Sequence, residues 1–163
     1  MTDPDRALSR ITGLRRLGMV LVLLCLVQYL LGMLLNLYVA LPRRHPGSSG
    51  SDYFLRAFQS VLWGLSHGNL LAAHAGLGLL IFLAALRLVL AAFRAPGQGL
   101  RAISVLGLLA VLAAGFNGAS FLSYHHDVSS MIMAASFAVA VLCFSWVVFR
   151  AVSRAPRAAP SSA

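Results

Sequence analysis

Histidines gather beside two apolar segments of this chain, and they are the residues best suited to chemistry. His67 and His74 are seven residues apart, so a continuous helix would place both on one face. His125 and His126 are followed directly by Asp127. Neutral imidazole binds haem iron, zinc and copper, and a nearby carboxylate can hold the ring in the required tautomer. The pattern therefore raises two cofactor hypotheses.

The first hypothesis is a b-type haem between the second and fourth membrane helices, with one axial ligand from each. His74 and His126 form the expected pair, and the alternatives are His74 with Met133 or His67 with His125. His126 falls at the predicted membrane interface, whereas His74 lies about one turn deeper. That difference in depth argues against coplanar ligation by the first pair.

The second hypothesis is a metal site outside the membrane. Its ligands would be His67, His125 and His126, with Asp127 and His45 as further candidates. Their spacing matches no known zinc motif. We therefore rank this site below the haem hypothesis and below a purely structural role.

Composition identifies the elements that must position these residues. The chain is 60% hydrophobic and only 10% charged, and its mean hydropathy is +0.84. Four apolar segments, at about 17–41, 70–93, 102–124 and 128–149, each reach the roughly 20 residues that cross a bilayer. They lack the alternation of a barrel strand. The sequence predicts an all-α membrane protein, with a single four-helix transmembrane domain over 17–151.

Charge predicts the orientation of this bundle. Ten of the arginines lie next to those ends of the spans that would face the cytoplasm, and three lie in the first loop, at 43, 44 and 56. Both termini are therefore expected in the cytoplasm. The N-terminal cytoplasmic segment would comprise residues 1–16, and residues 152–163 would form a disordered tail. The same distribution explains the net charge of +9 without a nucleic-acid partner.

The first external loop contains a predicted amphipathic helix at about 53–66. Asp52 can cap it, and Phe54, Phe58 and Leu62 recur at helical spacing. We expect this helix to lie at the membrane interface as a lid over the bundle.

Polar residues of the four spans fall at similar depth in the outer half of the bundle. They are either a hydrogen-bonded layer that only fixes helix packing or the lining of a site. Small residues at four-residue spacing on the last three spans favour packing over a haem slot. The predicted layer comprises Gln28, which lies deeper, Asn36, His74, Asn117, Ser130 and Asp127.

Three segments carry a resemblance to known proteins: VQYLLGMLLNLYVALP (27–42), HGNLLAAHAGLG (67–78) and NGASFLSYHHDVSSMIMA (117–134). They resemble uncharacterised small four-helix integral membrane proteins of actinobacteria, a likeness that implies no activity. The layout is also loosely similar to membrane b-type cytochromes and to one half of haem A synthase. That similarity implies haem ligation by His74 and His126.

No motif for an independent enzyme is present. A Ser/His/Asp constellation, a phosphate-binding glycine loop and paired carboxylates are all missing from the sequence, which argues against hydrolase, NTPase and transferase chemistry. The chain has no lysine or glutamate, a composition typical of GC-rich bacterial genomes. The expected location is the bacterial plasma membrane, in contact with lipid and with a redox partner or another membrane-complex subunit.

Overall fold

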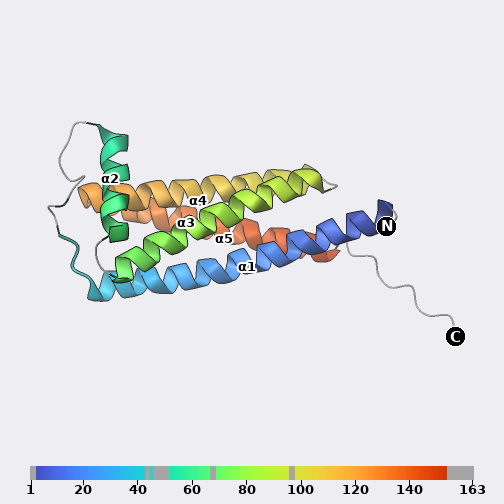
Figure 1. Cartoon of the computed structure of the whole chain (residues 1–163), viewed down its shortest axis with the longest axis horizontal. Coiled ribbons are helices and arrows are strands. Elements are labelled where there is room, and N and C mark those ends of the chain that lie inside the picture. Colours follow the sequence, from blue (N-terminus) through green and yellow to red (C-terminus); the bar gives the residue numbers. More distant parts are fainter. Residues whose placement is uncertain (1–2, 43–44, 46–51, 67–68, 96–97, 154–163) are drawn as a thin grey trace.

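Helices account for all the regular structure that the computed structural model describes, in residues 3–42, 45, 52–66, 69–95 and 98–153. Four helices are long and apolar enough to span a membrane, as Figure 1 shows. This confirms the predicted all-α bundle with membrane-spanning helices. The helices are α1 (Asp3–Tyr38), α2 (Tyr53–Ser66), α3 (Asn69–Arg94), α4 (Gln98–Tyr124) and α5 (Asp127–Ser153).

Several helices extend beyond the predicted spans. α1 begins at Asp3, within the predicted N-terminal segment, because Pro4 lies in the first turn, where its missing N–H costs nothing. It ends at Tyr38, ahead of Pro42, whose ring disfavours helix in the residue before it. α5 continues to Ser153, so the helix includes the first two residues of the predicted tail. Residues 154–163 of that tail lie outside the described residues.

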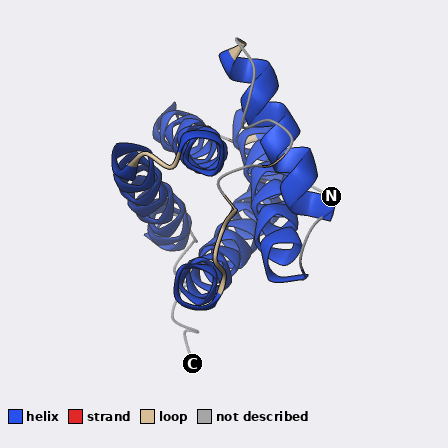
Figure 2. Cartoon of the chain, turned by 90° about the vertical axis from the view of Figure 1, so that its left-hand side faces the viewer, coloured by secondary structure: helices blue, strands red, loops and turns tan. Residues whose placement is uncertain are grey.

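The long helices form a ring in which α1 contacts α3 and α5, and α4 contacts the same two helices. α3 and α5 therefore face each other across the bundle, and no Cα atoms of their described residues lie within 8 Å of each other. α2 runs across one end of the bundle, against α3 and α4, and Figure 2 views the molecule from that side. We call this the α2 end. The opposite, arginine-rich end contains Arg10, Arg15, Arg16, Arg87, Arg94, Arg101 and Arg150.

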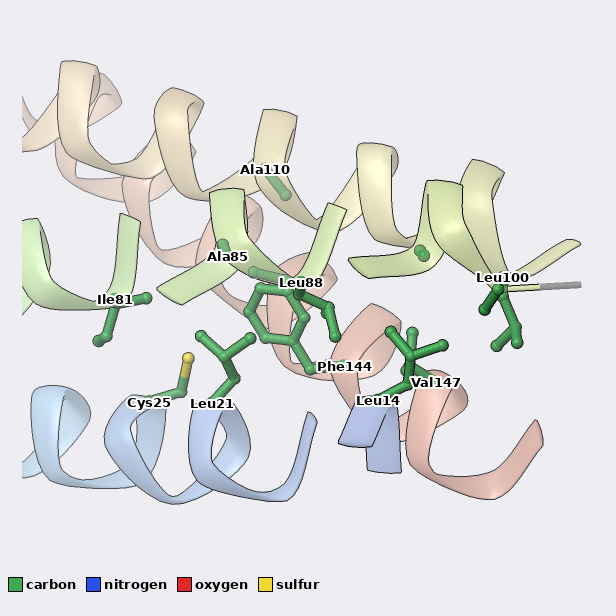
Figure 3. Packing of buried hydrophobic residues seen from close by; sticks show 13 residues of the cluster. Leu14, Leu21, Cys25, Ile81, Ala85, Leu88, Leu100, Ala110, Phe144 and Val147 are labelled. Carbon is green, nitrogen blue, oxygen red and sulfur yellow. The ribbon is translucent and has the colours of Figure 1, made fainter. Parts of the chain in front are cut away.

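The apolar core occupies the arginine-rich end and the middle of the bundle. Phe144 is fully buried between the long helices, against side chains that include Leu21 and Leu88 (Figure 3). Glycine makes this packing possible, because a Cβ at Gly107 would lie 2.8 Å from Cε1 of Phe144. The core comprises Leu14, Leu21, Cys25, Ile81, Ala85, Leu88, Ala92, Ala95, Leu100, Ala110, Ala140, Phe144 and Val147.

α2 begins as the sequence predicts. The side chain of Asp52 accepts a hydrogen bond from the Leu55 backbone N–H at 2.7 Å, which caps the helix. The face that α2 buries is made of small residues, Ala57, Ser60 and Gly64. Its large apolar side chains point away from the protein, and Phe54, Leu55, Phe58, Leu62 and Leu65 are all exposed.

Candidate functional site

A glutamine and a histidine join α1 to α3 in the half of the bundle nearer α2. The side-chain nitrogen Nε2 of Gln28 lies 3.1 Å from Nε2 of His74 and 3.1 Å from the backbone oxygen of the same residue. Both side chains are partly buried. The structure thus brings together two members of the predicted polar layer, although they belong to different predicted depths.

The hydrogen bonds determine where the imidazole proton lies. The atom of Gln28 that faces the His74 carbonyl must be the amide nitrogen, since an oxygen there would place two acceptors together. The same nitrogen donates to Nε2 of His74, which is therefore an acceptor. The ring is then neutral, with its proton on Nδ1. Two buried atoms of this pair have no hydrogen-bond partner, Nδ1 of His74 and Oε1 of Gln28.

Glycines allow the two side chains to reach across the helix interface. A Cβ at Gly32 would lie 3.2 Å from Cε1 of His74, and one at Gly78 would lie 3.4 Å from Nε2 of Gln28. Small residues were predicted to favour close packing on the second span, which carries Gly78, but not on the first, which carries Gly32. The signal was available, because Gly32 follows Gln28 by one helical turn and so shares its face.

The other members of the predicted layer do not join this pair. Asn117 donates from Nδ2 to the Ala113 carbonyl at 2.8 Å, one turn back in its own helix. Asn36 is exposed on α1, and Ser130 is partly buried on α5. Met133, which was predicted as an alternative haem ligand, packs on α4, where a Cβ at Gly118 would lie 3.1 Å from its sulfur. The described contacts therefore divide the predicted layer into separate groups.

The histidines at the α4–α5 turn are placed differently from His74. His126 is exposed and stacks on Tyr124, with ring centroids 6.0 Å apart, and Asp127 is exposed at the start of α5. His125 has a left-handed backbone with a φ of 55°, and its N–H bonds the Phe121 carbonyl at 2.8 Å, which ends α4.

His74 instead contacts Gln28 on α1, and no described contact joins it to His126. His67 lies outside the described residues. Nε2 of His125 is buried without a partner.

Serines hold α2 against the rest of the bundle, a role that the sequence did not reveal. Ser123 donates to the Ala119 carbonyl at 2.9 Å, so its single proton is used, and Ser60 must donate to Ser123 across 2.8 Å. Both serines are buried. Tyr53 donates to Ser120 at 2.9 Å, which extends this bonding along α4.

Aromatic side chains surround the same junction. Tyr124 stacks on Tyr53 with ring centroids 5.4 Å apart, and the guanidinium carbon of Arg56 lies 4.0 Å above the Tyr124 ring. His45 bonds the Leu122 carbonyl at 2.9 Å and stacks on Trp63. These contacts fix α2 to the end of α4.

Metal binding outside the membrane gains no support from this arrangement. Among the described residues, no group of three or more His, Cys, Asp or Glu side chains is placed to hold an ion. One predicted ligand, His67, is outside that set. Nε2 of His45 donates to the backbone carbonyl of Leu122. The external metal site remains an untested prediction.

Comparisons with known proteins provide no further assignment. No family model, curated protein or solved structure matches the chain. The function must therefore be argued from the chain's own residues.

Proposed function

We propose that this multi-pass membrane protein is a structural or accessory subunit, in which polar side chains at the α2 end fix how the helices pack. One observation carries the proposal: Nε2 of His74, the nitrogen needed for the expected haem ligation, accepts a hydrogen bond from Gln28. Interhelical hydrogen bonds of this kind orient membrane helices, for which apolar burial supplies little specificity.

The junction of α2 with α4 supports the same role. Its hydroxyl groups bond within the chain, Ser60 to Ser123 and Tyr53 to Ser120. The exposed apolar side of α2 suits the outer leaflet, so we place α2 at the membrane interface. The arginine-rich end then lies in the cytoplasm of a bacterial cell, with both termini, according to the positive-inside rule.

A b-type haem is the competing function. One observation favours it: α3, which carries His74, and α5, which follows His126, lie opposite each other across the bundle, and no Cα atoms of their described residues come within 8 Å of each other. The geometry of the two rings does not fit this ligation as it stands. His74 would have to release Gln28, and His126 would have to leave Tyr124.

An absorption spectrum separates the two functions. The protein should be expressed with ample haem, purified in mild detergent and compared with the His74→Ala and His126→Ala variants. We expect no Soret band from any of the three, and a lower unfolding temperature for His74→Ala. A Soret band that both substitutions remove would refute the accessory role and establish haem ligation.

A further inference from the structure

The arginine-rich end carries positive charge that the described contacts leave without a carboxylate partner. Arg10 donates to the Arg94 carbonyl at 2.7 Å, and Arg101 donates to the Ala95 carbonyl at 3.4 Å. These bonds satisfy the carbonyl groups of Arg94, the last residue of α3, and of Ala95, which follows it, but they neutralise no charge. Of the four acidic residues of the chain, Asp52 and Asp127 lie at the starts of α2 and α5 at the opposite end, and Asp3 and Asp5 lie in the first turns of α1 at this end.

A shallow and largely open hollow lies on the surface of α1 at this end. It is lined by Leu8, Ser9, Thr12, Gly13 and Arg16. A Cβ at Gly13 would meet no heavy atom within 4 Å, so the space above this residue is open. The hollow faces away from the bundle, because Leu14, which is 1% exposed, lies on the opposite side of the helix at about 100° per residue.

The same face of α1 becomes wholly apolar further along the helix. Val20 follows Arg16 by one turn, and Leu23 follows by two, and both are exposed. The hollow itself occupies the first turns of the candidate span Leu8–Tyr38. A guanidinium with two hydroxyl groups at the start of a membrane helix, above an exposed apolar stripe, matches an anionic head group with its acyl chains below.

We propose that this hollow binds the phosphate of an anionic phospholipid. Arg16 supplies the charge-assisted hydrogen bonds, and the hydroxyl groups of Ser9 and Thr12 donate to the remaining phosphate oxygens. The acyl chains lie along Val20 and Leu23. The inference rests on the membrane-spanning assignment of α1 and is independent of the proposed accessory role.

The test titrates purified protein in a neutral detergent with dihexanoyl phosphatidylglycerol, and native mass spectrometry counts the lipid bound. Dihexanoyl phosphatidylcholine and inorganic phosphate are titrated in parallel. We expect Arg16→Gln to weaken binding of phosphatidylglycerol about tenfold, because it removes charge-assisted hydrogen bonds to the phosphate. Gly13→Leu, which places a side chain in the hollow and keeps the charge, should weaken it as well.

Arg15→Gln is the matched control. Arg15 is exposed, carries the same charge at the same depth, and lies about 100° around the helix from Arg16, outside the hollow. We expect this variant to bind as the unchanged protein does. Equal weakening by the two arginine substitutions would overturn the proposal, because total charge would then explain binding. Equal affinity for phosphatidylcholine or for inorganic phosphate would also overturn it. Circular dichroism of each variant verifies that the bundle is folded.

Discussion

The bond between Gln28 and His74 gives the most direct test of the proposed packing role. The Gln28 amide donates to the ring and to the backbone carbonyl of His74. His74→Leu removes only the bond to the ring, because the carbonyl remains. Gln28→Leu removes both. Since interhelical hydrogen bonds in membranes contribute about 0.6 kcal/mol on average and about 1.7 kcal/mol at most, Gln28→Leu should cost more by about one such bond.

A double-mutant cycle isolates the bond between the two side chains. The free energy of unfolding should be measured for both single variants and for the double variant, by titration of detergent-solubilised protein with sodium dodecyl sulfate. We expect a coupling energy of about 0.6 kcal/mol. Asn36→Leu is the control, since it replaces an exposed polar residue of the same helix and should cost no stability. A coupling energy of zero, with both single variants as stable as the control, would refute the packing role of this pair.

Three further substitutions test other contacts of the structure. Gly107→Ala places a Cβ 2.8 Å from Phe144, and this overpacking should lower the free energy of unfolding by about 1–3 kcal/mol. A Cβ at Gly115 meets nothing within 4 Å, so Gly115→Ala should be neutral or stabilising. Equal shifts of the unfolding temperature in detergent would contradict this. His125→Gly should raise the free energy of unfolding by about 1 kcal/mol, because glycine adopts a φ of 55° without strain. A lower free energy of unfolding would mean that a contact of the imidazole contributes more than this strain costs. Ser60→Ala should speed amide hydrogen exchange in α2 and leave the spans unchanged, because it removes a buried bond to α4; unchanged exchange in α2 would count against that bond.

Length and hydropathy sufficed to predict the spans, because each span is a run of neighbouring apolar residues. The pairing of polar residues was less accessible. The sequence placed His74 level with Asn36, on the assumption that the helix ends are level. In the structure His74 lies five residues after the start of α3, but Gln28 lies ten residues before the end of α1. α1 therefore extends about 7 Å further than the depth count assumed.

The contact face of α2 could not be read from its amphipathic pattern for a different reason. In water, Phe54 and Phe58 would be expected to turn toward the protein. Lipid is as apolar as these side chains, so a membrane protein gains little by burying them. Small residues such as Ala57 and Ser60 allow close approach instead, and they form the buried face. Hydrophobic periodicity identified the helix but not its contact side.

The two ends of the bundle are held by different kinds of interaction, and this difference indicates where the molecule can change. At the arginine-rich end, Phe144 fills the space that Gly107 provides, so packing depends on shape and tolerates little movement. At the α2 end, individual hydrogen bonds hold the helices, and two polar atoms of the Gln28 and His74 pair lack partners. Exchanging such a bond costs less than disrupting a close-packed core. A rearrangement of the helices should therefore begin at the α2 end, while the apolar core keeps the spans together.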